Sequence, residues 1–261
     1  MHPYLQVSRP FVLAHRGLAT SAPENSMAAF AAAVDLGVTH LETDVHATAD
    51  GELVVFHDPT LERLTELQGP VAAVPWAVLR QARLADGEPL PRLADVLDAW
   101  PAVRVNVDLK STGAVRPFVE LVRARKALDR VCVASFSDRR RRAAVRALAA
   151  EGPVASSLGL RGSIAAVTLA TGGAPAPVLR RALQGAVALQ LPDAGRRRVL
   201  TRRLVDAVHA AGAQVHVWTV DDPGRMHELV ALGVDGIVTN RADLALAALA
   251  GSSRSEEGRR P

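Results

Sequence analysis

Short runs of consecutive apolar residues alternate along the chain with longer segments in which apolar residues recur at helical spacing. We expect a buried strand in each apolar run, at residues 11–15, 38–45, 103–109, 130–135, 153–157, 186–191, 214–220 and 234–239. Segments between them, such as SMAAFAAAVDLG and RRLVDAVHAAG, show the apolar spacing of helices and end in glycine. Such strand-helix units, eight in about 250 residues, predict an α/β fold, a closed (β/α)8 TIM barrel.

An open, doubly wound sheet is the alternative that the same alternation allows. The first strand-to-helix turn, HRGLATSAPEN, lacks the G-x-G-x-x-G pattern with which such sheets hold a dinucleotide, and the chain has no P-loop sequence. We therefore favour the barrel.

The connection after the second strand region is irregular. The sequence TADGELVVFHD has an Asp-Gly pair followed by alternating apolar residues, which is typical of a hairpin and places His57 at the end of an added strand. Residues from about 58 to 93 are expected to form a small insertion over one mouth of the barrel. We expect one domain over residues 1–250 and a disordered tail over residues 251–261, whose sequence GSSRSEEGRRP lacks any apolar period.

Composition limits the functions that the chain can have. The hydrophobic content of 49% in 261 residues is enough for a large core. Cys132 is the only cysteine and lies in an apolar run, so an intramolecular disulfide is excluded. No run reaches the roughly 18 apolar residues of a membrane span, and the N-terminus lacks the pattern of a secretory signal. We expect a cytoplasmic protein with no stable membrane insertion.

The formal net charge of +4 comes from arginine, which includes runs at residues 139–142 and 196–198. Both runs fall where helices are expected, and they lack the interleaved aromatic or glycine residues of nucleic-acid-binding stripes. We interpret them as solvated helix faces and predict no nucleic-acid partner.

Carboxylates occur on expected strands where apolar residues would be usual. Side chains at i and i+2 of a strand share a face, so Glu42 lies on the same face as Asp44, and Asp108 on the same face as Lys110. Buried carboxylates need a positive partner, and a set of oxygen ligands suits Mg²⁺ or Ca²⁺. The alternative is that these acids simply pair with Arg16 and Lys110.

Basic residues end the strands in the same region. His15 and Arg16 end the first expected strand and His57 ends the added one, so the two histidines can face one point and divide acid and base roles. Lys110 is one of two lysines in an arginine-rich chain, which favours a specific point charge, as for a phosphate oxygen. Trp218, in HVWTV, is either core or an apolar wall at the mouth.

Several motifs together resemble the glycerophosphodiester phosphodiesterase family: AHRG, PENS followed by AF, LETDVHATADGELVVFHD, DLK, HVWTV and GVDGIVTN. The resemblance runs from about residue 11 to residue 249. It implies a barrel that hydrolyses glycerophosphodiesters to glycerol 3-phosphate and an alcohol, with a divalent cation, Mg²⁺ or Ca²⁺, at its mouth. The roles that it implies are general acid and base for His15 and His57, metal ligation by Glu42 and Asp44, phosphate binding by Arg16 and Lys110, and a glycerol-side wall at Trp218.

The chain departs from this family pattern at two positions in the expected site. Asp108 stands where the family generally has glutamate, so its shorter carboxylate reaches the metal only through a shift of the metal, the backbone or a bridging water. Asn240 stands where the family often has an acidic residue.

Two other functions remain open for a barrel with these residues. One is a hydrolase of lysophospholipids or another phosphodiester, which requires an apolar patch around the mouth. The other is a catalytically weak sensor that binds phosphodiesters, made possible by Asp108. In each case the expected partner is a small molecule.

Overall fold

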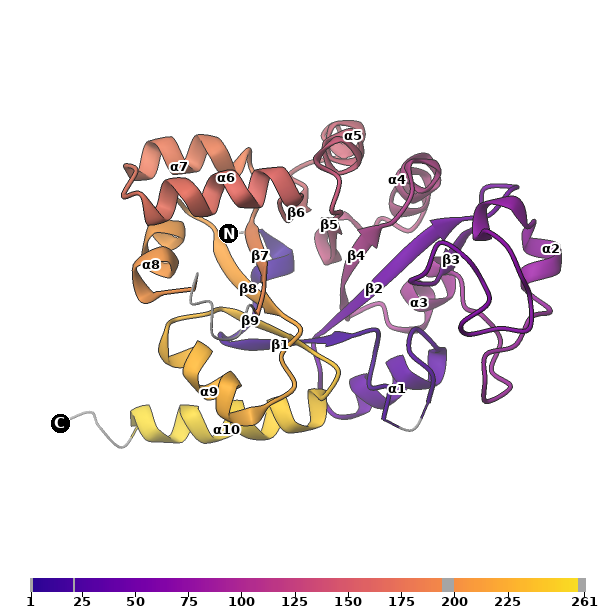
Figure 1. Cartoon of the computed structure of the whole chain (residues 1–261), viewed down its shortest axis with the longest axis horizontal. Coiled ribbons are helices and arrows are strands. Elements are labelled where there is room, and N and C mark those ends of the chain that lie inside the picture. Colours follow the sequence, from indigo (N-terminus) through magenta and orange to yellow (C-terminus); the bar gives the residue numbers. More distant parts are fainter. Residues whose placement is uncertain (1, 21, 194–199, 258–261) are drawn as a thin grey trace.

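The computed structural model describes residues 2–20, 22–193 and 200–257, and its central feature is a nearly closed barrel of parallel strands (Figure 1). These strands are β1 (Phe11–His15), β2 (His40–Ala47), β4 (Arg104–Leu109), β5 (Val131–Ala134), β6 (Ala155–Ser156), β7 (Ala188–Pro192), β8 (Gln214–Trp218) and β9 (Gly236–Thr239). Neighbours run in the order β6-β5-β4-β2-β1-β9-β8-β7, and a parallel bridge between Ser157 and Ala188 links the two ends. The predicted TIM barrel is confirmed.

Helices cover the outside of this barrel (Figure 1). They are α1 (Met27–Asp35), α3 (Leu93–Ala99), α4 (Val115–Ala124), α5 (Asp138–Leu148), α6 (Leu160–Thr171), α7 (Ala176–Leu183), α8 (Arg202–Ala210), α9 (Pro223–Ala231) and α10 (Ala242–Glu257). Side chains cap several of their N-termini, as where Ser26 accepts from the backbone N–H of Ala29 and Thr201 from that of Leu204. Because the helices follow the strands, the strand-to-helix turns gather at one mouth of the barrel.

A short 3-10 helix, η1 (Pro3–Leu5), closes the opposite end of the barrel. Tyr4 and Leu5 are buried in an apolar cluster with residues near the starts of the strands, including Phe11 and Cys132. Burial raises the pKa of the Cys132 thiol to about 12, in keeping with a structural residue rather than a reactive one. His40 belongs to the same end, where its ring stacks on Phe11 with the ring centroids 4.4 Å apart.

Two buried histidines in the barrel interior make its stability depend on pH. Burial lowers the pKa of His40 to about 3 and that of His216 to about 4. In the unfolded chain both imidazoles take up protons near pH 6.5, so the unfolded state binds more protons than the folded state between pH 6.5 and about 4. The free energy of unfolding is therefore expected to fall as the pH drops through this window, as measured by urea unfolding at pH 7, 6 and 5.

Substitution of His40 tests the origin of that fall. We expect His40→Gln to show a shallower loss of stability between pH 7 and 5, whereas His227→Gln, on the exposed face of α9, follows the wild type. Equal slopes for all three proteins would contradict the assignment.

The insertion after β2 has a small core of its own. It begins with β3 (Leu53–Val55), which pairs antiparallel with β2, and continues through η2 (Val71–Ala73) and α2 (Trp76–Leu79). Its buried apolar residues form a cluster separate from the main core: Val54, Phe56, Leu61, Val71, Leu79, Ala82, Leu84 and Leu90. The predicted hairpin is present, but β3 ends at Val55, so His57 lies just beyond the strand rather than at its end.

Three further expectations concern the arginine runs, the tail and the membrane. Arg141 in the first run is only 1% exposed and donates to Ser156 Oγ and Gln184 Oε1, so the expectation of a wholly solvated run is wrong there. Residues 196–198 lie outside the described residues.

The last helix runs to Glu257, into the segment predicted to be disordered, and residues 258–261 are not described. Among the described helices, none combines the length and the apolar content needed to span a bilayer.

Candidate active site

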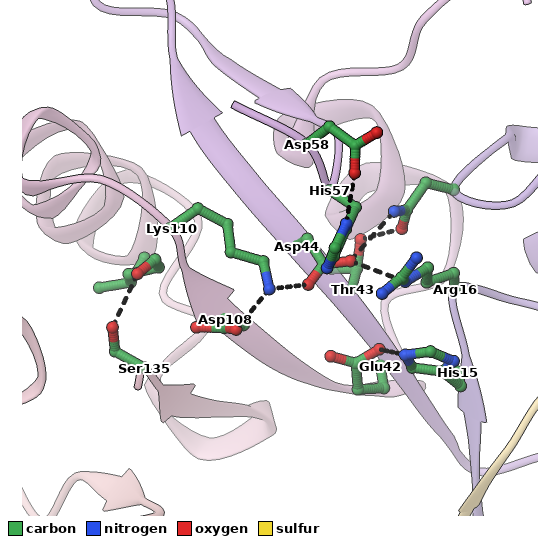
Figure 2. Close-up of polar contacts among 12 residues, drawn as sticks. His15, Arg16, Glu42, Thr43, Asp44, His57, Asp58, Asp108, Lys110 and Ser135 are labelled. Carbon is green, nitrogen blue, oxygen red and sulfur yellow. Dashed lines mark hydrogen bonds and ion pairs between the residues drawn. The ribbon is translucent and has the colours of Figure 1, made fainter. Parts of the chain in front are cut away.

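A cavity of about 240 Å³ opens at the mouth where the strand-to-helix turns gather. All eight residues singled out in the sequence line it: His15, Arg16, Glu42, Asp44, His57, Asp108, Lys110 and Trp218. They come from β1, β2, β4 and β8 and from the turns that follow β1, β3 and β4. The fold thus brings together residues that are far apart in the sequence (Figure 2).

Three carboxylates lie on the inner face of two neighbouring strands. β2 pairs in parallel with β4 so that Asp44 is opposite Asp108, and strand alternation turns Glu42 to the same face as Asp44. All three side chains are buried. The alternation read from the sequence therefore places three acids at the floor of the cavity.

Two positively charged side chains contact these carboxylates. Lys110 Nζ is 2.8 Å from both Asp44 Oδ1 and Asp108 Oδ2, and Arg16 Nε is 3.0 Å from Asp44 Oδ2 (Figure 2). Burial alone would raise the pKa of Asp44, but the charges of Lys110 and Arg16 hold it below its ordinary value. The pairing that the sequence left open as an alternative to a metal is present for Asp44 and for one oxygen of Asp108.

Glu42 and Asp108 are less well satisfied. Among the described residues, Glu42 Oε2 and Asp108 Oδ1 are buried and have no hydrogen-bond partner. Burial raises the pKa of both carboxyl groups, and for Glu42 the charges of Asp44 and Asp108 raise it further. No three His, Cys, Asp or Glu side chains of the described chain form a ready-made metal cluster. The unpaired oxygens nevertheless fit a hard divalent cation, which prefers oxygen ligands.

The turn after β1 brings Arg16 to Asp44. Arg16 has a φ of 58°, in the left-handed region, and its backbone N–H donates to the carbonyl of Glu42 at 2.9 Å. Gly17 follows with a φ of 86° and lies directly against the backbone of Ala29. The chain therefore bends sharply enough for the Arg16 side chain to lie over the floor of the cavity.

Asn25 fixes the orientation of Asp44. Its Nδ2 donates to Asp44 Oδ2 at 3.3 Å, and its Oδ1 accepts from Thr43 Oγ1 at 2.8 Å. Asn25 also has a φ of 60°, a conformation that asparagine tolerates better than most residues. The PENS motif that contains Asn25 does not define its role, because the contact with β2 is formed only in the folded chain.

His15 hydrogen-bonds to a neutral amide. Its Nδ1 is 2.7 Å from Asn240 Oδ1, and its Nε2 lies 3.8 Å from Glu42 Oε2. Burial lowers the pKa of His15, and the nearby charge of Arg16 lowers it further. The ring is therefore mainly neutral at pH 7.

His57 has a carboxylate partner instead. Its Nδ1 is 2.6 Å from Asp58 Oδ1 (Figure 2). Arg63 Nε donates to the other oxygen of Asp58, and this bond is the main cause that lowers the pKa of Asp58 to about 2. The carbonyl of His57 lies 3.2 Å from His46 Nε2, which holds the backbone at this point.

Arg63 also ties the insertion to the turn after β1. Its Nη2 donates to Glu24 Oε1 at 2.6 Å, and the same oxygen accepts from Arg16 Nη1 at 2.9 Å. A continuous set of ion pairs thus runs from Asp58 to Arg16. The PENS motif that contains Glu24 does not define its role, and no periodic pattern in the sequence marks Arg63.

Arg140, from the first arginine run, holds the backbone at Lys110 in place. Arg140 Nη1 donates to the carbonyl of Lys110 at 2.6 Å, and its Nε donates to Ser135 Oγ at 3.0 Å. Ser135 in turn donates to the carbonyl of Leu109 at 2.7 Å. The turns after β4 and β5 are therefore held together beside the site.

One side of the cavity is apolar. The rings of Trp218 and Phe136 meet edge to face, with centroids 5.7 Å apart, so Trp218 forms a wall at the mouth, and it also packs against the buried apolar cluster that contains Phe11 and Leu13. Phe136 is 53% exposed and Leu160, which also lines the cavity, is 54% exposed. Ile164, one turn further along α6, is 57% exposed. The apolar rim thus comes from the turn after β5 and from the first turns of α6.

Comparison with known proteins agrees with this geometry. The model of the glycerophosphoryl diester phosphodiesterase family matches residues 15–244. The protein named probable glycerophosphodiester phosphodiesterase 2 of Mycobacterium tuberculosis is 42% identical over 243 residues, which cover 92% of this chain and 91% of that protein. A crystal structure of a glycerophosphodiester phosphodiesterase from Agrobacterium tumefaciens aligns with a TM-score of 0.76 at 26% identity, covering 92% of this chain and 99% of that chain.

A further solved structure shares the fold. It is a phosphodiesterase from Oleispira antarctica in complex with the product sn-glycerol-3-phosphate, with a TM-score of 0.76 at 23% identity over 92% of this chain and 97% of that one. The family match covers nearly the whole barrel, and the relative from Mycobacterium tuberculosis aligns over almost its full length. This chain therefore belongs to the glycerophosphoryl diester phosphodiesterase family.

Proposed function

We propose that this protein hydrolyses glycerophosphodiesters to sn-glycerol 3-phosphate and an alcohol, in a reaction that requires a divalent cation and in which His15 and His57 transfer protons. The observation that carries the proposal is one cavity that holds two oriented histidines, the positively charged side chains of Arg16 and Lys110, and three buried carboxylates. The family membership and the relatives' names support the same reaction class.

The charge of the cavity floor supports a cation. Metal ligation requires Glu42, Asp44 and Asp108 to be ionised, and the floor then has one more negative charge than Arg16 and Lys110 balance, which a divalent cation would offset for an anionic phosphodiester. The unpaired oxygens Glu42 Oε2 and Asp108 Oδ1 offer ligands of the type that Mg²⁺ and Ca²⁺ prefer. When bound, such a cation would supply charge that neutralises a phosphoryl oxygen.

The protein's own side chains would do the remaining work. Arg16 and Lys110 would bind the phosphate oxygens. Their guanidinium and ammonium groups already reach the floor of the cavity, because each forms an ion pair with Asp44. With Nδ1 of each histidine held by a partner, Nε2 of His15 and His57 would exchange protons with the attacking and departing oxygens. Trp218 and Phe136 would pack against the carbon atoms of the glycerol.

An assay of product release tests this proposal. We expect glycerol 3-phosphate to form from glycerophosphocholine or glycerophosphoethanolamine with Mg²⁺ or Ca²⁺, and a strong chelator to abolish the reaction until cation is added back. We also expect Asp108→Asn to raise the half-saturating cation concentration by about 10-fold to 100-fold, whereas Asp206→Asn, on the exposed face of α8, leaves it unchanged.

Three outcomes would contradict parts of the proposal. Full activity in the presence of the chelator would exclude the cation. Tight binding of glycerol 3-phosphate in calorimetry without turnover of any diester would instead favour a sensor. An unchanged cation requirement in Asp108→Asn would show that this carboxylate does not ligate the metal.

Arg63 is expected to act on turnover through His57. Removing its side chain in Arg63→Ala frees Asp58 and Glu24, so the His57 ring loses its fixed orientation and kcat should fall by about 10-fold or more. Arg63→Lys should recover part of the loss. Because Arg63 is 46% exposed, its ion pairs contribute little to stability, and the free energy of unfolding should change by less than about 1 kcal/mol.

The matched control for Arg63 is Arg116→Ala. Arg116 pairs with Glu120 on the outer face of α4 and is 87% exposed. Steady-state kinetics should show no effect there, and a kcat for Arg63→Ala equal to that of the wild type would contradict the role of Arg63.

The apolar rim favours one second candidate, hydrolysis of lysophospholipids in the same site. Phe136, Leu160 and Ile164 expose apolar surface at and beside the mouth, where an acyl chain attached to the glycerol would leave the cavity. The same assay decides between the two: faster turnover of lysophosphatidylcholine than of glycerophosphocholine would make the lysolipid the preferred substrate.

A further inference from the structure

The ends of β8 and β9 meet beside His15. The two strands pair in parallel, with His216 opposite Gly236 and Val217 opposite Ile237. Asp221 follows β8 after a short turn, and Asn240 follows β9 directly. This juxtaposition puts a carboxylate and an amide next to each other, with the amide facing the histidine.

The Asp221 carboxylate receives three hydrogen bonds from Thr239 and Asn240. Its Oδ1 accepts from the backbone N–H of Asn240 at 2.8 Å and from Thr239 Oγ1 at 2.9 Å, and its Oδ2 accepts from Asn240 Nδ2 at 2.8 Å. Burial alone would raise the pKa of Asp221, but these hydrogen bonds hold it below its ordinary value. The group is therefore an ionised carboxylate that can only accept hydrogen bonds.

The orientation of the Asn240 amide is determined by Asp221, because this carboxylate can only accept hydrogen bonds. The amide must direct its NH₂ group to Asp221, which leaves Oδ1 to face His15 Nδ1 at 2.7 Å. An amide oxygen has no proton to give, so the proton in this hydrogen bond must be on His15 Nδ1. In the neutral ring, Nε2 then carries a lone pair on the side of Glu42 and the cavity.

We propose that Asn240, held by Asp221, is a positioning residue that fixes His15 in the tautomer with the proton on Nδ1 and Nε2 free toward the cavity. The consequence for turnover rests on the proposed function, whereas the tautomer itself does not. His57 reaches the same orientation through a different partner, the carboxylate of Asp58. Each of the two histidines is thus oriented by a residue outside the metal and phosphate sites.

Exchange of the two side chains tests the pair as a unit. Asn240→Asp alone would set two carboxylates against each other where a 2.8 Å hydrogen bond now lies, and Asp221→Asn alone would remove the group that dictates the amide orientation. We expect each single variant to lower kcat by about 10-fold to 100-fold with little change in KM. The double variant Asp221→Asn/Asn240→Asp restores a donor and an acceptor across the pair and keeps an acceptor for His15, so it should recover most of the loss.

A spectroscopic measurement reads the tautomer without relying on activity. In ¹⁵N-labelled wild-type protein at pH 8, the His15 ring should show a protonated Nδ1 and a bare Nε2. Asn240→Leu, which keeps the side-chain size but removes the acceptor, should give a mixture of tautomers. Thermal melting verifies that each variant is folded, and Asp206→Asn serves as a carboxylate control remote from the site.

The outcomes separate this inference from the proposed function. A single Nδ1–H tautomer in the wild type together with a mixture in Asn240→Leu supports the positioning role even if no glycerophosphodiester is hydrolysed. An unchanged tautomer in Asn240→Leu overturns it, whatever the activity. In an active wild type, additive losses in the double variant would likewise show that Asp221 and Asn240 do not act together.

Discussion

Replacing His57 with glutamine is expected to lower kcat for glycerophosphodiester hydrolysis by about 10²-fold to 10⁴-fold. Glutamine has a similar size and can still form hydrogen bonds, but its amide does not exchange a proton near neutral pH. The expected effect is large because His57 lines the cavity and is already oriented by Asp58. Steady-state kinetics with glycerophosphocholine at saturating cation measure the loss.

Two comparisons make the His57 result specific. His15→Gln should produce a loss of the same order, since both rings face the same cavity. His227→Gln, whose ring Nδ1 lies 2.8 Å from the carbonyl of Pro223 on the exposed side of α9, should keep the wild-type kcat. If His57→Gln kept more than about a tenth of the wild-type rate, proton transfer by His57 would have to be abandoned.

Replacing Gly17 with alanine is expected to destabilise the fold strongly. A Cβ atom there would lie 2.6 Å from the carbonyl carbon and 2.7 Å from the carbonyl oxygen of Ala29, and 2.8 Å from the nitrogen of Phe30. These are backbone atoms of α1 and cannot rotate away. Together with the φ of +86°, the clash should lower the free energy of unfolding by about 3 kcal/mol or more.

Gly51→Ala is the matched control for Gly17. Gly51 has a φ of +89°, but a Cβ placed there would have no neighbour within 4 Å. Only the conformational penalty of about 1 kcal/mol applies. Urea unfolding of both variants isolates the steric part, and equal destabilisation would show that α1 can move away from the turn.

The strands and the floor of the site followed from the sequence because both depend on local patterns. Consecutive apolar residues marked the strands, and the spacing of Glu42, Asp44 and Asp108 on those strands set their common face. A parallel barrel then leaves only one mouth at which such side chains meet. These features need no knowledge of contacts between distant segments.

The supporting contacts did not follow, because each depends on a turn geometry or a distant partner. Asn25 reaches Asp44 only through a left-handed backbone conformation, which its sequence does not specify. Arg63 reaches Asp58 and Glu24 only once the insertion has folded. Arg140 lies in a run that looked like a solvated surface, yet its guanidinium holds the carbonyl of Lys110.

The two ends of the barrel determine how small molecules reach and leave the cavity. At one end, η1 packs against the starts of the strands. At the other end, the cavity opens to solvent at the mouth that Phe136 and Leu160 border. Substrate and both reaction products would pass through that mouth. A departing phosphate monoester therefore has to leave before the next diester can enter, so accumulated product should compete directly with substrate for entry.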